Sequence, residues 1–77
     1  MRVNYDVEDL RAFCCLVRVG QYTAAASQLC ITPSALSRRI TKLESEIGAP
    51  LFERTTRRLV VTPLALTLYE RVLPVMG

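Results

Sequence analysis

One segment in the middle of the chain carries both a strong helix start and a regular apolar stripe. Thr32 suits the N-cap position, and Pro33 suits the first helical position, where its missing N–H costs nothing. Four apolar residues then recur at helical spacing and predict the buried side: Leu36, Ile40, Leu43 and Ile47. Gly48 favours the left-handed backbone that commonly ends a helix. The sequence therefore predicts a helix over 33–47 with one buried face.

The opposite side of this predicted helix carries hydroxyls and cations and no carboxylate. At about 100° per residue, the residues on that side are Ser34, Arg38, Thr41, Lys42 and Ser45. A solvated helix face usually mixes both charges, so this composition favours contact with phosphates and base edges. The net charge of +3 points the same way, because residues 32–58 hold all of the excess. Nucleic acid is the partner that this distribution suggests.

The residues before this segment predict two further helices. The first is expected to be capped by Asp6, with Asp9 in the position of a capping-box acid, and to end at Gly20. Thr23 is expected to open a short, alanine-rich second helix over 24–30. A small-residue helix that a tight turn joins to a polar-faced helix is a helix-turn-helix.

The residues after the segment predict a hairpin and a last helix. Pro50 excludes helix continuation, and two short strands are expected at 51–53 and 59–61, with a basic tip between them. Thr62 and Pro63 repeat the cap-then-proline start and open the last helix. The predicted fold class is therefore mainly α, a winged helix-turn-helix with a three-helix core and a two-stranded β wing.

The cysteines and the absence of histidine exclude several function classes. With Cys14, Cys15 and Cys30 and no His, neither a four-ligand zinc site nor a cofactor is expected. Cys14 and Cys30 are expected to be small buried residues in a reducing cytoplasm, with only Cys15 partly exposed; a redox sensor is the sharper alternative. No signal peptide or membrane span is expected. The sequence shows neither a nucleophile–base pair nor a glycine-rich phosphate loop, so catalytic activity is not expected.

Two other binding classes remain open at this stage. A winged helix that binds protein instead of nucleic acid would usually lack both the carboxylate-free face and the basic wing. An RNA-binding domain would more naturally present exposed aromatic rings for stacking. Of the five aromatic residues, Phe13 and Phe52 are expected to be buried.

The order of these blocks resembles a known family. The blocks are Asp9-Leu10-Arg11-Ala12-Phe13, Thr23-Ala24-Ala25-Ala26, Thr32-Pro33-Ser34-Ala35-Leu36-Ser37-Arg38-Arg39-Ile40, Leu43-Glu44, Gly48, Leu51-Phe52-Glu53-Arg54 and Leu59-Val60-Val61-Thr62-Pro63. Together they resemble the N-terminal DNA-binding domain of LysR-type transcriptional regulators. The resemblance covers nearly the whole chain, and the Ser-Arg-x-Ile-x-x-Leu-Glu and Leu-Phe-x-Arg blocks are far more specific than a generic helix-turn-helix.

The resemblance implies a domain organisation and partners. LysR-type regulators are bacterial dimeric or tetrameric activators and repressors, with a C-terminal linker helix that pairs subunits and a domain that binds a small effector. We therefore expect a DNA-binding domain over 1–62, the start of the linker helix over 63–77, and an effector domain outside this chain. We expect the chain to be a fragment of a longer cytoplasmic protein that forms a homodimer, with a naturally short, domain-only regulator as the alternative. It departs from the family at 62–65, where Thr-Pro-Leu-Ala replaces the usual Thr-x-Ala-Gly.

Double-stranded DNA is the expected partner, read at an inverted-repeat site by two recognition helices in the major groove. Arg38 is the first choice for base readout, because a guanidinium can bind guanine O6 and N7 together. The other contacts are expected from hydroxyls and helix starts near phosphates, and from the basic wing on the backbone or minor groove. The expected DNA-binding residues are Thr23, Thr32, Pro33, Ser34, Ser37, Arg38, Thr41, Lys42, Arg54, Thr55, Arg57 and Arg58.

Structural roles compete with DNA contact at several positions. Arg39 lies beside the apolar stripe, where an intramolecular ion pair is as plausible as a DNA contact. Glu44 is expected to be structural, for example in a pair with a core-side arginine, and Arg54 serves equally well as a brace for the wing. The last helix has a second apolar side, which suggests packing on a partner. Its expected dimerisation residues are Leu66, Tyr69, Leu73 and Met76, opposite Leu64, Leu68, Val72 and Val75.

Overall fold

The computed structural model describes residues 7–54 and 58–76, with the backbone alone for Arg54 and 73–76. Along these ranges the order is α1 (Val7–Val19), α2 (Tyr22–Leu29), α3 (Pro33–Ile47), β1 (Phe52–Arg54), β2 (Leu59–Val61) and α4 (Pro63–Met76). The predicted fold class is confirmed: helices dominate, and a two-stranded antiparallel wing follows the helix-turn-helix of α2 and α3. None of the described helices is both long enough and apolar enough to cross a bilayer.

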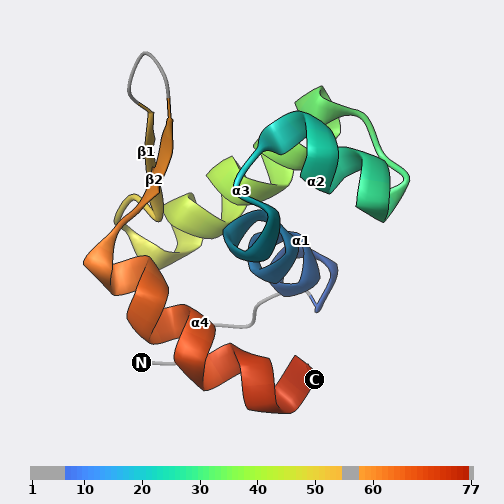
Figure 1. Cartoon of the computed structure of the whole chain (residues 1–77). Coiled ribbons are helices and arrows are strands. Elements are labelled where there is room, and N and C mark those ends of the chain that lie inside the picture. Colours follow the sequence, from blue (N-terminus) through green and yellow to red (C-terminus); the bar gives the residue numbers. More distant parts are fainter. Residues whose placement is uncertain (1–6, 55–57, 77) are drawn as a thin grey trace.

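Helix α1 lies at the centre of the fold. Figure 1 shows it between the α2–α3 pair and α4, and it packs against all three of these helices. Because neighbours surround it on several sides, its buried positions are not confined to one stripe. They include consecutive residues from Ala12 to Leu16. Ala25 and Ala26 of α2 are also buried, and their small side chains allow α2 to approach α1 closely.

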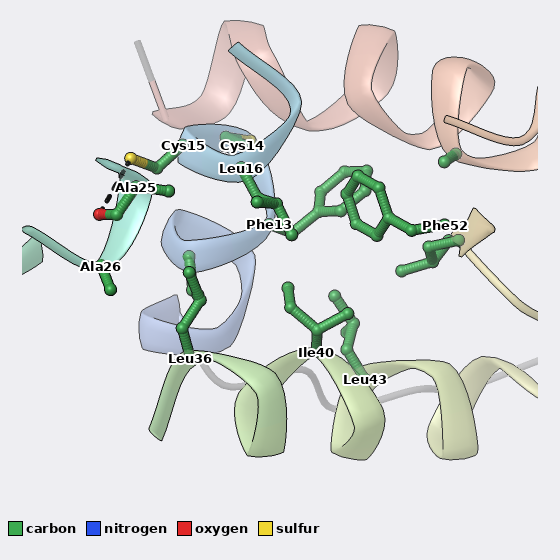
Figure 2. Close-up of a cluster of buried hydrophobic side chains, with 13 residues drawn as sticks. Phe13, Cys14, Cys15, Leu16, Ala25, Ala26, Leu36, Ile40, Leu43 and Phe52 are labelled. Atoms are coloured by element: carbon green, nitrogen blue, oxygen red, sulfur yellow. Dashed lines mark hydrogen bonds between the residues drawn. The ribbon is translucent and has the colours of Figure 1, made fainter. Parts of the chain in front are cut away.

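The apolar stripe of α3 faces α1, as predicted. Leu36, Ile40 and Leu43 are at most 2% exposed, and Figure 2 shows them pointing from α3 toward α1. The rings of Phe13 and Phe52 meet in the same cluster, with their centroids 5.8 Å apart in an edge-to-face arrangement. Both rings are buried, which confirms the expectation from the sequence. The base of the wing is thus part of the hydrophobic core.

The wing pairs Phe52 with Val61 and Arg54 with Leu59. Its first strand begins one residue later than predicted, since Leu51 precedes the ladder as a fully buried residue. The backbone N–H of Leu51 donates to Glu44 of α3 instead of to the opposite strand. The hairpin therefore starts from a point that is tied to α3.

The two ends of α2 differ from the prediction. The helix begins at Tyr22 with Gln21 as N-cap, so Thr23 lies inside the first turn and does not open the helix. Gln21 takes this place because its backbone is extended and its carbonyl accepts from the N–H of Ala25 at 3.0 Å. At the other end, Cys30 is the left-handed C-cap with φ 60°, a conformation that usually falls to glycine.

The predicted exposure of the cysteines is wrong at two of the three positions. Cys30 is exposed, because it belongs to the turn after α2 and not to the buried side of that helix. Cys15 is buried, and its thiol lies 3.7 Å from the carbonyl oxygen of Ala25 (Figure 2). Cys14 is buried as expected. Burial raises the pKa of the Cys14 thiol, an effect that Arg18 opposes and Cys15 reinforces.

The three thiols are expected to react at two separate rates with an aromatic disulfide reagent at neutral pH. Cys30 should react first, since the thiolate of an exposed cysteine is accessible. Cys14 and Cys15 should react only as fast as the domain opens. Stopped-flow absorbance gives the amplitudes, and the Cys30→Ser variant should lose the fast phase. A fast phase that survives in this variant would show that the buried pair is accessible.

Candidate nucleic-acid interface

Helix α3 presents an exposed polar face on the side away from the core. Ser34, Arg38, Thr41 and Ser45 are exposed on this face, and Ser37 is half-buried at its edge. The N-terminus of α3 is capped as predicted: the hydroxyl of Thr32 accepts from the N–H of Ala35 at 3.1 Å, and Pro33 follows at the first helical position. These contacts hold the leading end of the face in a regular helix.

A buried carboxylate from α1 holds one flank of α3. Asp9 is 2% exposed, and its Oδ1 lies 3.5 Å from a guanidinium nitrogen of Arg39. Its Oδ2 lies 3.1 Å from Nζ of Lys42, a charge contact whose geometry is not that of a hydrogen bond. The capping-box role predicted for Asp9 involves Asp6, which lies outside the described residues. What the structure shows is the Asp9 carboxylate facing the cations of α3. The intramolecular alternative for Arg39 is the one that the structure shows.

The sequence did contain a signal for this buried charge. Asp9 precedes Ala12, Phe13 and Leu16 by three, four and seven residues, which places it on the buried side of α1. An aspartate on an apolar stripe is seldom fully buried unless a cation meets it. The identity of the cations depends on how α3 crosses α1, which no local pattern gives.

Glu44 holds the opposite flank of α3 to the wing. Its Oε2 accepts from the backbone N–H of Leu51 at 2.7 Å and from that of Phe52 at 3.3 Å. The expected structural role of Glu44 is confirmed, with backbone amides as the partners. Two donors on one carboxylate oxygen give charge-assisted bonds that fix where β1 leaves α3. Gly48, with φ 86°, makes the turn between them possible.

Thr62 joins the wing to α4. Its hydroxyl lies 3.0 Å from the carbonyl oxygen of Pro50 and 3.1 Å from that of Leu51, and it has one proton to share between them. The same hydroxyl oxygen accepts from the N–H of Ala65 at 3.2 Å, so it also caps α4. Thr62 is only 8% exposed. The predicted cap is therefore confirmed, and it also acts as a cross-link to the start of the wing.

The remaining predicted contact residues are described only in part. Thr32, Pro33, Ser34, Arg38, Thr41 and Lys42 are all exposed at α3, and Thr23 is exposed on α2. Arg58 is exposed at the start of the second half of the wing. Thr55 and Arg57 lie outside the described residues, and Arg54 is described by its backbone in β1. The described part of the interface is therefore the α3 face, with the wing rising beside it (Figure 1).

Helix α4 divides its apolar residues differently from the prediction. The sequence predicts Tyr69 on the partner-facing side, but its ring lies edge-on to that of Phe13, with the centroids 6.4 Å apart. The assignment is corrected, because Ala65, Tyr69 and Val72 lie on one side of the helix and pack on the core. Among the described side chains of α4, Leu64 and Leu66 are the large apolar ones that stay exposed, by 43% and 50%. The side chains of Leu73 and Met76 lie outside the described part.

The sequence of this chain matches a model of a known family of bacterial regulators. A family model described as bacterial regulatory helix-turn-helix protein, lysR family, matches residues 7–66, from the start of α1 into α4. The chain belongs to the LysR family. This LysR-type chain is 44% identical over 62 residues to the probable HTH-type transcriptional regulator LtrA of Klebsiella pneumoniae. That match covers 80% of the chain and 20% of the relative, so the chain spans about a fifth of the relative's length.

Solved structures of LysR-type proteins have the same fold. The BenM_DBD/catB site 1 DNA complex contains a chain with a TM-score of 0.87 and 35% identity, covering 92% of this chain and 79% of that one. The oxidized form of OxyR from Corynebacterium glutamicum gives a TM-score of 0.90 at 29% identity, covering 95% of this chain and 22% of that one. This LysR-type chain accordingly has the helix-turn-helix fold of the DNA-binding domain of the family.

The hydroxyl of Thr62 is expected to contribute measurably to stability. Replacing Thr62 by Val keeps the shape but removes both the cap and the bond to the wing, which should lower the free energy of unfolding by about 1–3 kcal/mol. Thr62→Ser keeps the hydroxyl and should lose clearly less. Urea unfolding followed by circular dichroism measures both variants. A large loss in Thr62→Ser together with little loss in Thr62→Val would show that the methyl group, and not the hydroxyl, carries the effect.

Proposed function

We propose that this domain binds double-stranded DNA in a sequence-specific manner, with α3 in the major groove. The observation that carries the proposal is the exposed face of α3, whose described residues at Ser34, Arg38, Thr41 and Ser45 include no carboxylate. The core holds this helix by its apolar stripe, while Asp9 and Glu44 hold its two flanks. A helix fixed in this way can enter a groove without losing its own contacts.

The proposed roles follow from the chemistry of each side chain. Arg38 reads a guanine through O6 and N7, and Ser34, Ser37 and Thr41 reach base edges or phosphates. Pro33 contacts a thymine methyl group, and Thr32 offers its hydroxyl to a phosphate at the start of α3. Thr23 of α2 contacts the DNA backbone. Lys42 is left out of the proposed contacts, because its Nζ lies 3.1 Å from the buried carboxylate of Asp9. The wing follows the backbone or minor groove with Arg54, Thr55, Arg57 and Arg58.

The proposal includes a homodimer through α4. Leu64 and Leu66 are exposed apolar side chains of α4 on either flank of the side that packs on the core. A second α4 packed on the flank of Leu66 would place two copies of α3 on an inverted-repeat site. The dimerisation residues that remain from the sequence proposal are Leu66, Leu73 and Met76. In the longer cytoplasmic protein, a small-molecule effector would act through a domain beyond this chain.

A selection from random duplexes tests the function directly. The domain should enrich an inverted repeat, because two symmetry-related recognition helices read equivalent half-sites. Its affinity should fall steeply as the salt concentration rises, as expected for phosphate contacts. Fluorescence anisotropy on enriched and scrambled duplexes gives both quantities. Absence of binding even at low salt would contradict the proposal and favour a protein-binding winged helix.

The Arg38→Ala variant should lose about 1–3 kcal/mol of binding free energy on the enriched site and relax the preference at one base pair. Arg38→Lys should lose most of this as well, because an ammonium cannot bind both guanine acceptors in the same planar geometry. Arg18→Ala is the charge-matched control, since Arg18 is an exposed arginine near the end of α1. Equal losses for Arg38→Ala and Arg18→Ala would mean that Arg38 contributes only charge.

A further inference from the structure

The cluster formed by Asp9, Arg39 and Lys42 combines one buried anion with two accessible cations. The side chain of Asp9 is 2% exposed, whereas those of Arg39 and Lys42 are 35% and 56% exposed. The anion comes from α1 and both cations come from α3, three residues apart on the flank next to the exposed polar face. The cations can therefore reach solvent, but the carboxylate cannot.

Because the carboxylate is buried and the cations are accessible to solvent, moving either cation away from Asp9 costs free energy. A buried carboxylate that loses its counter-charge is strongly unfavourable, because little water can replace the cation. Within the described residues, Oδ2 of Asp9 accepts no hydrogen bond, so the charge contact with Lys42 is its stabilising partner. A DNA phosphate that recruits Lys42 would have to offset the loss of this contact. Arg39 is held in the same way through Oδ1.

We infer that Asp9 is a positioning residue that withholds Arg39 and Lys42 from DNA phosphates. The inference rests on the proposed function, since it concerns how strongly α3 attracts DNA. Cations that contact phosphates add affinity for every sequence alike, whereas Arg38 adds affinity for a particular base. By keeping two cations of α3 on an internal anion, Asp9 lowers the sequence-independent part of the affinity and leaves the base contact of Arg38 in place. Base contacts then supply a larger share of the total binding free energy.

A double-mutant cycle on a scrambled duplex tests the inference. The proteins are the unchanged domain, Asp9→Asn, Lys42→Gln and the double variant, each measured by anisotropy over a series of salt concentrations. Each cation released to a phosphate steepens the slope of log affinity against log salt by about 0.9. Asp9→Asn should therefore steepen the slope by about one to two and tighten non-cognate binding several-fold. On its own, Lys42→Gln should leave the slope unchanged. In the Asp9→Asn background, the same substitution should make the slope shallower by about one.

Two results would overturn the inference. One is an unchanged or shallower slope in Asp9→Asn, and the other is an equal effect of Lys42→Gln in both backgrounds. A merely structural role of Asp9 would change affinity and stability without steepening the slope. Failure of the unchanged domain to bind any duplex would instead contradict the proposed function, which separates the two failures.

Folding of Asp9→Asn is checked by circular dichroism before binding is measured. If this variant does not fold, the single variants Lys42→Gln and Arg39→Gln in the unchanged background decide the question. Slopes equal to that of the unchanged domain support the inference, because the cations are then already absent from the phosphates. A slope reduced by about one in either variant would overturn it.

Discussion

The ring of Phe13 in α1 is the point at which the wing, α3 and α4 meet. It is fully buried in α1 and lies edge-on both to Phe52 of the wing and to Tyr69 of α4. The α3 residues Leu36, Ile40 and Leu43 are buried in the same cluster (Figure 2). A domain of this size has a small core, so one large ring shared by several elements carries a substantial part of their relative placement.

Two carboxylates then fix the orientation that the apolar core leaves less defined. Apolar packing is largely non-directional, so a helix can rotate slightly on its neighbours at modest cost. Asp9 draws one flank of α3 toward α1, while Glu44 binds the first amides of the wing on the other flank. Charged contacts have defined partners and distances, and they therefore specify which residues of α3 remain outward. The outward face is the one that carries Arg38 and its neighbouring hydroxyls.

The sequence predicted α3 to the residue because all of its determinants are local. Thr32, Pro33 and Gly48 mark its ends, and the stripe from Leu36 to Ile47 marks its buried side. Positions that depend on tertiary contacts were predicted less well. The ion pairs of Asp9 do not follow from local pattern, because their cations come from a helix thirty residues further along the chain. Cys30 is exposed and not buried as predicted, because α2 ends one residue earlier than the sequence predicts.

Predictions about the candidate site likewise succeed where the local pattern decides and fail where contacts between elements decide. Which residues of α3 point outward followed from helical periodicity alone, and the structure bears this out for Ser34, Arg38 and Thr41. The involvement of Lys42 with Asp9 did not follow, since periodicity gives the direction of a side chain but not the charge that it meets. Tyr69 shows the same limit, because two apolar sides of α4 predict two packing surfaces without saying which residue serves which.

The shared hydroxyl of Thr62 has a mechanical consequence. Since the same oxygen caps α4 and bonds to the carbonyls that precede β1, one side chain ties the start of the helix to the start of the hairpin. A rotation of α4 about this residue would strain these bonds unless the hairpin moved with the helix. The angle of the wing relative to DNA would thus be set by how α4 is held at its far end.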